Sequence, residues 1–341
     1  MNRTLLIERI IIVVVLLAAI FSPIAAVCFG AANIAVMDVL AAFQAMLGGT
    51  VELSDIKQRI ILELRLPRVL LAFLCGAGLS LAGAVLQTVT RNPLADPYLF
   101  GISSGASFGA VLVIAAWGIG GSLTGQYAIT MGAFAGSALS VMLVVSLAGS
   151  GVQIERMLLS GVAVSFMFSS ATSLVLYSSE PQAAATLLFW TLGSFAAASW
   201  TKLFLPALVI SVSIAIFLAY SRPLRAILAG DESARSLGVE VNRLRVAMLL
   251  LSSLMTATLV ATCGGIGFVG LMIPHIVRRL IASHSRHVLM GSAVLGGVFM
   301  IWVDVLAREL LESSELPIGV ITAAIGSVFF IVVMKRKSRL T

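Results

Sequence analysis

A polar segment interrupts the apolar sequence between residues 221 and 245. It reads SRPLRAILAGDESARSLGVEVNRLR and carries five arginines and three acidic residues. Gly230 and Gly238 bracket a short helical pattern that opens on Asp231, as expected of a carboxylate at a helix start and a glycine at a helix end. Guanidinium and carboxylate groups arranged on a short helix can pair with another protein. The segment is predicted to be a docking surface.

Three further arginines stand near the ends of apolar runs. Arg65 and Arg68 belong to the motif RLPR, in which Pro67 argues against a regular helix before it. Arg308 follows Asp304 by one helical turn, a spacing that permits an ion pair. Two interpretations stay open for these guanidiniums. In the first, the guanidiniums reach lipid headgroups. In the second, they form a socket for acidic side chains of an outer partner, because Arg binds carboxylates through two parallel hydrogen bonds.

The chain lacks sequence motifs for ATP binding and for zinc-dependent hydrolysis. No lysine follows a glycine, so the phosphate-binding loop GxxxxGK[ST] is absent and the chain cannot cradle ATP itself. The motif HExxH does not occur either. These absences argue against an enzyme.

Neither the histidines nor the cysteines form a metal-ligand pattern. His284 and His287 lie in SHSRH, crowded by arginines, and His275 is expected to pack within an apolar run. The cysteines all fall in apolar runs without CxxC spacing and are expected to be small buried residues: Cys28, Cys75 and Cys263. No metal and no cofactor is expected in this chain.

Composition assigns the chain to a membrane. Of its 341 residues, 60% are apolar and 11% charged, and the mean hydropathy is +1.09, whereas soluble domains carry about 25% charged residues. Continuous apolar runs of about 20 residues predict α-helices instead of barrel strands. We expect one all-α polytopic domain, residues 1–341, with about ten spans. They are Ile10–Gly30, Ile61–Leu86, Leu99–Trp117, Tyr127–Ala148, Met157–Tyr177, Leu203–Tyr220, Val246–Cys263, Phe268–Ile281, Val288–Leu310 and Ile318–Met334.

Glycines predict how some of these spans pack. The eighth span is shorter than a bilayer requires and follows CGGIGFVG, residues 263–270, so it is expected to be a half-helix buried against protein. Glycines spaced by four residues predict close helix packing within the chain, not a dimer seam. They are Gly101, Gly105 and Gly109 in the third span and Gly132 and Gly136 in the fourth.

The distribution of positive charge predicts the orientation. With both termini in the cytoplasm, sixteen of the 22 Lys and Arg residues lie inside, which follows the positive-inside rule. The segment 221–245 is then cytoplasmic. Topology and anionic lipid headgroups account for the net charge of +7, so no nucleic acid partner is needed.

Ionisable residues within the spans bear on the mode of transport. An ion-coupled carrier usually holds its driving ion with Asp, Glu or His near the bilayer midplane. Here Asp304 and Glu63 both lie near the outer ends of spans. The pattern favours a transport pathway that has no energy source of its own. A separate energy-providing protein could act on its cytoplasmic segment.

Four collinear segments resemble the FecCD family, the permease subunits of binding-protein-dependent ABC importers for iron siderophores, haem and vitamin B12. The resemblance covers essentially the whole chain after the first span. The segments are RLPRVLLAFLCGAGLSLAGAVLQTVTRNPLADPYLFGISSGASFGA (65–110), GDESARSLGVEVNR (230–243), GGIGFVGLMIPHIVRRL (264–280) and ELPIGVITAAIGSVFF (315–330).

The resemblance implies a vitamin B12 permease-like fold and a set of partners. It implies a homodimer with the pathway between subunits, two copies of a separate ATPase that carries the ATP and Mg, and one outer substrate-binding protein. ATP-driven closure of the ATPases would tilt the spans and change the side to which the cavity opens. The implied location is the cytoplasmic membrane.

The resemblance also implies roles for individual residues. Arg65, Arg68 and Arg308 would dock the binding protein, and Asn92 with Leu94, in the NPLADP turn, would form an inner gate. The segment QIER, 153–156, would be a second gate, but it departs from the small hydroxyl residues of the vitamin B12 permease. ATPase coupling would fall to Gly230, Asp231, Glu232, Ser233, Ala234, Arg235, Leu237 and Gly238.

The substrate is the least determined property. The residues of the motifs favour a ferric siderophore as the substrate, with haem and vitamin B12 as alternatives. Residues 178–202 are expected to form a short periplasmic helix whose Phe189 and Trp190 anchor at the membrane interface or meet a bulky chelate. Two other classes stay open: an ion-coupled secondary carrier or channel, and a membrane-embedded assembly or signalling subunit.

Overall fold

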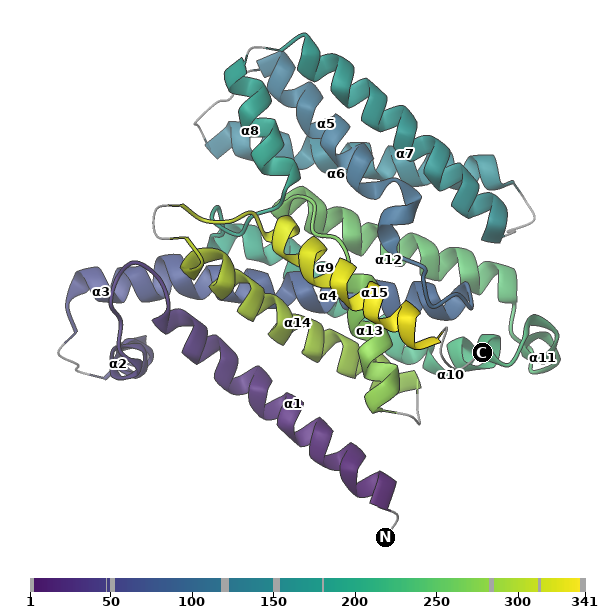
Figure 1. Cartoon of the computed structure of the whole chain (residues 1–341), viewed down its shortest axis with the longest axis horizontal. Coiled ribbons are helices and arrows are strands. Elements are labelled where there is room, and N and C mark those ends of the chain that lie inside the picture. Colours follow the sequence, from purple (N-terminus) through teal and green to yellow (C-terminus); the bar gives the residue numbers. More distant parts are fainter. Residues whose placement is uncertain are drawn as a thin grey trace.

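The computed structural model describes residues 3–46, 48–49, 53–117, 123–149, 154–179, 181–281, 285–311 and 314–337. Over these ranges the regular secondary structure is helical, and Figure 1 shows the long helices running side by side in a bundle. Gln153, in the second predicted gate, and His284 lie outside the described residues.

Each predicted span corresponds to a helix. The ten helices are α1 (Arg3–Cys28), α4 (Leu66–Val89), α5 (Ile102–Trp117), α6 (Leu123–Ala148), α7 (Ile154–Tyr177), α9 (Trp200–Ala219), α12 (Val241–Cys263), α13 (Val269–Leu280), α14 (Ser285–Glu309) and α15 (Ile318–Lys337). By length and apolar composition, seven membrane-spanning candidates occur among the described residues, and α5, α13 and α15 fall short of that criterion. Shorter helices connect them: α2 (Val36–Met46), α3 (Asp55–Arg59), α8 (Pro181–Thr191), α10 (Ser221–Leu228) and α11 (Asp231–Ser236).

Helix α4 forms the centre of the bundle. Nearly all of its residues from Val69 onward are buried, and its glycines let other helices approach closely. A Cβ at Gly76 would lie 2.0 Å from the carbonyl oxygen of Gly296 in α14, and one at Gly83 would lie 1.8 Å from that of Gly270 in α13. Larger side chains at these positions would push the helices apart.

Helices α5, α6, α7 and α8 form a second group above the centre in Figure 1. The predicted glycine contacts join α5 to α6 within the chain. A Cβ at Gly109 would lie 1.9 Å from the Gly132 carbonyl oxygen, and one at Gly136 would lie 2.0 Å from that of Gly105. The prediction of intramolecular glycine packing is confirmed.

The regular α-helix α4 starts beside Pro67, as expected, but the chain before it is also helical, in an irregular form. Helical structure begins at Asp55 and continues through a π-helical segment, η1 (Ile60–Arg65), into α4. In the π pattern an amide bonds to the carbonyl five residues earlier, as Leu66 does to Ile61. Pro67 has no amide to offer the Leu62 carbonyl, and Trp200 Nε1 donates to that oxygen instead at 2.9 Å. A side chain from α9 thus replaces the missing backbone donor.

The predicted buried half-helix is confirmed in α13. The chain leaves α12 at Gly264, with φ of 77°, and re-enters helix after Phe268, with φ of 68°. Val269, Met272 and Ile273 are buried. The amide of Ile266, between the two helices, donates to the Tyr98 hydroxyl at 2.8 Å, so a side chain satisfies the interrupted backbone.

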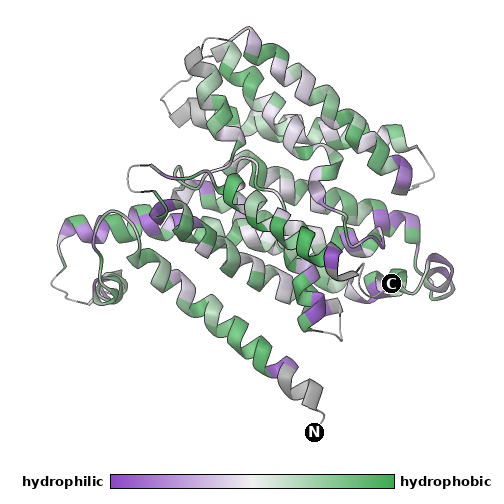
Figure 2. Ribbon diagram, viewed as in Figure 1, coloured by the Kyte–Doolittle hydropathy of each residue, from purple (hydrophilic) through white to green (hydrophobic). Residues whose placement is uncertain are grey.

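Polar residues gather at the two ends of the bundle. Figure 2 shows hydrophilic residues around α2 and α3 at one end and around α10 and α11 at the other, with apolar helices between them. In Figure 1, α1 begins and α15 ends toward the α10–α11 end. This arrangement is that of a protein spanning a bilayer along the length of its helices.

Candidate functional site

The bracketing glycines of the segment 221–245 are confirmed as turn positions. Gly230, with φ of 113°, precedes α11, and Gly238, with φ of 79°, follows it. The amides of Gly238 and Val239 donate to Arg235 and Ala234 carbonyls, which closes the helix in a Schellman motif. Because these turns are local, α11 keeps its shape without a partner.

Most of α11 faces outward. Leu237, just after the helix, is 71% exposed, and the other exposed residues that the resemblance assigns to coupling are Glu232, Ser233, Arg235 and Gly238. Ala234 is fully buried and anchors the helix to the protein. Asp231 points inward to Arg91 and Arg245, two arginines that the sequence analysis did not single out. The geometry suits a docking helix, and its coupling role stays a prediction.

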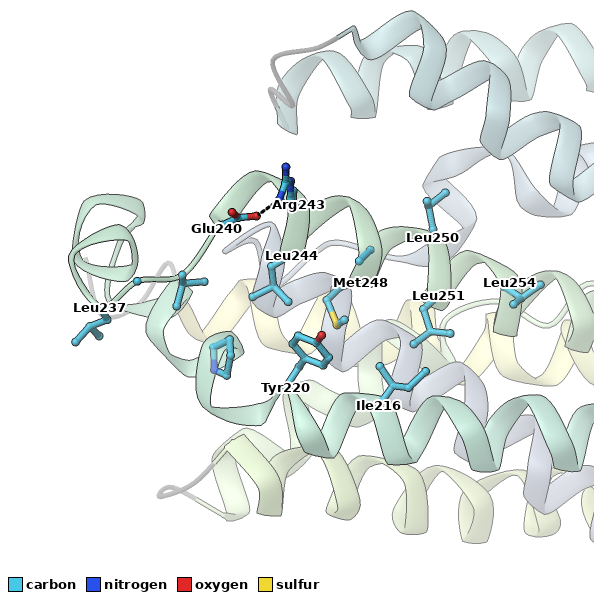
Figure 3. Close-up of a pocket in the computed structure, with 14 residues that line it drawn as sticks. Ile216, Tyr220, Leu237, Glu240, Arg243, Leu244, Met248, Leu250, Leu251 and Leu254 are labelled. Atoms are coloured by element: carbon cyan, nitrogen blue, oxygen red, sulfur yellow. Dashed lines mark hydrogen bonds and ion pairs between the residues drawn. The ribbon is translucent and has the colours of Figure 1, made fainter.

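An apolar groove continues from Leu237 along α9 and α12, as Figure 3 shows. Its volume is about 910 Å³, and Met248, Leu251 and Leu254 are among its lining residues. An exposed ion pair between Glu240 and Arg243, at 2.7 Å, lies along it. The apolar surface beside α11 therefore extends beyond Leu237 into this groove.

The predicted inner gate is a tight turn that follows α4. Asn92 Oδ1 accepts from the Leu94 amide at 2.9 Å, and Leu94 itself is 56% exposed. Asp96 is buried and accepts from the Tyr98 amide at 2.8 Å, starting the short 3₁₀ helix η2 (Pro97–Phe100). Of the second predicted gate, Glu155 and Arg156 are exposed at the start of α7. The gating roles stay predictions.

Two of the three arginines predicted to lie on the outer side hold the end of α1. Arg65 donates to the carbonyls of Val27 at 2.8 Å and Ala32 at 2.7 Å. Arg308 donates to the carbonyls of Phe29 at 2.8 Å and Ala26 at 3.3 Å. Val27 and Ala26 lie in the last turn of α1, and Phe29 and Ala32 follow it, so both guanidiniums lie at a helix C-terminus, where a cation is favourable.

The third outer arginine lies between two carboxylates. Arg68 lies 2.9 Å from Asp304 and forms a bidentate pair with Glu315 at 2.8 Å. Asp304 is fully buried and also pairs with Arg308 at 3.2 Å, as the sequence predicted. Leaving one member of such a buried network unpaired costs roughly 3–5 kcal/mol. The hydrogen bonds from Arg68 lower the pKa of Glu315, so this pair persists until the pH falls through that lowered pKa.

The sequence therefore placed these arginines together correctly, but the structure gives each an acceptor within the chain. An acidic partner would have to displace Glu315 to reach Arg68. On the same end, Arg59 and Glu63 are more accessible, with side chains 75% and 61% exposed. Docking through Arg65, Arg68 and Arg308 stays a prediction.

A cavity lined by hydroxyl groups lies between α5, α7 and α8. Its volume is about 430 Å³, within the range of about 300–1,000 Å³ typical of small-molecule sites. Helix periodicity places Ser103 and Ser107 on one face of α5 and Ser165, Ser169 and Ser173 on one face of α7, since the members of each set are four residues apart. The hydroxyl-bearing residues that line it are Tyr98, Ser103, Ser104, Ser107, Ser165, Ser169, Thr172, Ser173 and Thr191.

The cavity offers oxygen atoms and no charge. Ser104, Thr172 and Ser173 donate to carbonyls of their own helices at 2.8–3.0 Å, which leaves oxygen lone pairs for another donor. Among the described lining residues none is ionised at neutral pH and none is a histidine. Residues 101–105, GISSG, match the GxSxG nucleophile pattern, but Ser103 lies in the first turn of a helix, not on a strand-to-helix elbow. The sequence analysis missed this cavity, although the four-residue spacing of serines was a signal for it.

Within the described residues, no group of three His, Cys, Asp or Glu side chains could hold a metal ion. Cys75 and Cys263 are buried and Cys28 is half-buried. The fold defines a polytopic helical membrane protein with an exposed polar helix, α11, at one end.

Comparisons with known proteins agree with this class. The model of the FecCD transport family matches residues 12–336. The Fe(3+)-citrate import system permease protein YfmD of Bacillus subtilis is 37% identical over 286 residues, covering 83% of each chain. The hemin transport system permease protein HmuU of Yersinia pestis is 35% identical over 286 residues, covering 83% of this chain and 85% of its own. Permeases named for cobalamin and molybdate import match at 37% and 36% identity.

A solved structure is also similar. It is described as an inward-facing conformation of a metal-chelate type ABC transporter, with a TM-score of 0.83, 30% identity, and coverage of 96% of this chain and 99% of that one. The chain belongs to the FecCD transport family. It is a permease of the ABC importer type, a multi-pass protein of the inner membrane, and as a transport subunit it is not itself an enzyme.

Proposed function

We propose that this chain forms the pathway of an ATP-driven importer that moves a ferric siderophore across the cytoplasmic membrane by alternating access. It works as a homodimer with two ATPase subunits, which carry ATP and Mg, and with one outer binding protein. Both termini and the segment 221–245 face the cytoplasm. Haem and vitamin B12 are the alternative cargoes.

The hydroxyl-lined cavity is the observation that favours an oxygen-rich chelate. Its hydroxyl oxygens, that of Ser173 among them, can accept from hydroxyl groups on the outside of a siderophore, and Ser103 and Ser169 can also donate to its carbonyl and carboxyl groups. A macrocycle such as haem presents a broad apolar face, which apolar and aromatic walls would bind better. Tyr98 is the single aromatic lining residue described, and its hydroxyl already accepts from Ile266.

The absence of charge in this cavity suits passage instead of tight binding. Neutral hydroxyl groups form hydrogen bonds worth about 0.5–1.5 kcal/mol each, since water competes for both partners. A chelate handed over by a binding protein can therefore enter and leave. Tight recognition would then belong to the binding protein.

Charge pairing at Asp304 argues against ion coupling. This carboxylate is fully buried within a predicted span, but Arg68 and Arg308 both bind it. A carboxylate that carries a driving ion must exchange partners during the cycle. Two buried guanidiniums leave Asp304 little freedom to do so.

The test is uptake by cells that lack this chain. Deletion cells and complemented cells are grown under iron restriction and given radiolabelled iron as a ferric hydroxamate, as ferric citrate or as haem. Cobalamin uptake is measured in parallel. We expect loss of siderophore-bound iron uptake with haem and cobalamin uptake intact.

Other outcomes reassign the cargo or refute the class. A defect restricted to haem or cobalamin would overturn the siderophore proposal and keep the importer. Uptake that persists when cellular ATP is depleted but the proton gradient is maintained would contradict ATP-driven import. No defect with any of these compounds would refute the proposed function.

A further inference from the structure

Asp231, the first residue of α11, binds two arginines from two other helix ends: Arg91 after α4 and Arg245 in the first turns of α12. Its Oδ1 lies 3.2 Å from Arg91 Nη2 and 3.1 Å from Arg245 Nη2, which also donates to Oδ2 at 3.3 Å. The Asp231 side chain is 28% exposed and that of Arg245 is 4% exposed. Unlike its neighbours Glu232 and Arg235, Asp231 is thus directed into the protein.

Arg91 occupies a backbone position that favours glycine. Its φ is 51°, in the left-handed region. The Arg91 amide donates to the Thr88 carbonyl and the Asn92 amide to the Gln87 carbonyl, both at 3.2 Å, which are the two hydrogen bonds of a Schellman motif ending α4. Glycine is usual there because it has no Cβ to strain. An arginine held in this conformation points to a use for its side chain.

Arg245 joins the same helix end from α12. Its Nε donates to the Val89 carbonyl at 3.0 Å, in the last turn of α4, where carbonyls have no partner within the helix. Its Nη2 donates to the Asp231 carboxylate. One buried guanidinium therefore connects α11 to the end of α4, and a displacement of the Asp231 carboxylate acts on that end.

We infer that Arg91 and Arg245 are positioning residues that transmit movement of α11 to the turn at residues 92–97. The inference rests on the proposed function, because it takes α11 as the ATPase contact and Asn92 with Leu94 as part of the inner gate. Arg91 directly precedes Asn92. When the ATPases displace α11, the carboxylate of Asp231 pulls the Arg91 side chain and rotates the backbone at the start of the gate turn.

Arg278 provides an internal comparison for a purely stabilising role. This residue of α13 also binds the end of α4, donating to the Ala84 carbonyl at 3.1 Å, to Thr88 Oγ1 at 3.2 Å and to Gln87 Oε1. Among the hydrogen bonds and ion pairs of the described residues, none joins Arg278 to α11. Loss of Arg278 should weaken the fold without affecting transmission.

The experiment uses Arg91→Gly in the complete transporter, with its ATPase and binding protein, reconstituted in liposomes. Glycine adopts the left-handed backbone without strain and removes only the link to Asp231. Uptake of radiolabelled iron, supplied as a ferric hydroxamate, and ATP hydrolysis are measured in the same vesicles. We expect the iron imported per ATP hydrolysed to fall by about two- to thirtyfold, the range of coupling changes caused by single substitutions, with no fall in the thermal unfolding midpoint, because glycine relieves the backbone strain at this position.

Three variants serve as controls. Asp231→Asn should show the same loss of coupling, and Arg91→Lys, which keeps a cation, should restore part of it. Arg278→Gln should lower the unfolding midpoint and leave the ratio of iron to ATP unchanged. These opposite patterns separate transmission from stability.

The outcomes separate a failure of the proposed function from a failure of this inference. If the unaltered transporter imports no iron on ATP addition, the proposed function fails. If it imports iron and Arg91→Gly imports as much per ATP, the inference is wrong and the two arginines only stabilise the end of α4.

Discussion

At the scale of residues, this protein uses buried arginines to satisfy helix ends. Arg65 binds the Val27 carbonyl in the last turn of α1, Arg308 binds the Phe29 carbonyl just after it, and Arg245 binds the last carbonyl of α4. Arg91 holds a left-handed backbone conformation that costs a non-glycine residue roughly 1–2 kcal/mol. Each arginine combines a permanent charge with several donors, so a single side chain can bind a carbonyl and a carboxylate at once.

The proposed docking of a binding protein on Arg68 can be tested at Glu315. If carboxylates of the binding protein replace Glu315 on Arg68, the variant Glu315→Gln should tighten binding, because it weakens the internal competitor. The expected gain in affinity is at most about fivefold, equivalent to about 1 kcal/mol for a partly exposed pair. Binding of the purified binding protein to the permease complex in nanodiscs measures it.

Glu63→Gln is the matched control, since Glu63 lies on the same end and pairs with the exposed Arg59. That variant should leave the affinity unchanged. Unchanged or weaker binding by Glu315→Gln would show that Arg68 serves the permease fold and not the docking of the partner.

At the scale of elements, close glycine contacts determine how the helices pack. The Cβ positions at Gly83 and Gly109 overlap backbone atoms of neighbouring helices, which cannot rotate away as a side chain can. In a membrane the hydrophobic effect does not draw helices together, so such contacts and interhelical hydrogen bonds carry much of the association.

These contacts predict a large effect of a single methyl group. Gly109→Ala should destabilise the permease by about 1–3 kcal/mol or more, as overpacking does in protein cores. Gly267→Ala should be close to neutral, because a Cβ there meets nothing within 4 Å. The thermal unfolding midpoint of the detergent-solubilised transporter compares the two. Equal midpoints would contradict the tight packing of α5 against α6.

At the scale of the whole molecule, the two polar ends indicate that the helices cross the bilayer along their length. The α2–α3 end and the α10–α11 end carry the hydrophilic residues, and the helices between them are apolar. This arrangement permits either orientation of the bundle. The excess of basic residues at the α10–α11 end is what favours a cytoplasmic location for it.

Cysteine labelling tests this orientation. A Cys28→Ala background removes the half-buried thiol and leaves Cys75 and Cys263, which are buried. In that background a membrane-impermeant thiol reagent should label Arg59→Cys in cells with a permeable outer barrier, and should label Arg235→Cys only in inverted vesicles. The reverse pattern would place α11 and both termini outside.

The sequence by itself determined the class, the helices and the family. Apolar length predicted ten helices, seven of which are long and apolar enough to span a membrane within the described residues, and glycine spacing predicted the packing of α5 on α6 and the break before α13. These features are predictable because they depend on local properties: the length of an apolar run, the φ that glycine allows and the absence of a Cβ.

Only the tertiary structure decided what the charged and hydroxyl side chains do. The sequence grouped Arg65, Arg68 and Arg308, but their acceptors come from α1 and from residues more than two hundred positions away, such as Asp304 and Glu315. The link from Asp231 to Arg91 and the hydroxyl cavity between α5 and α7 arise in the same way. A hydrogen bond requires its partner within about 3 Å, and only the folding of the chain brings such distant groups together.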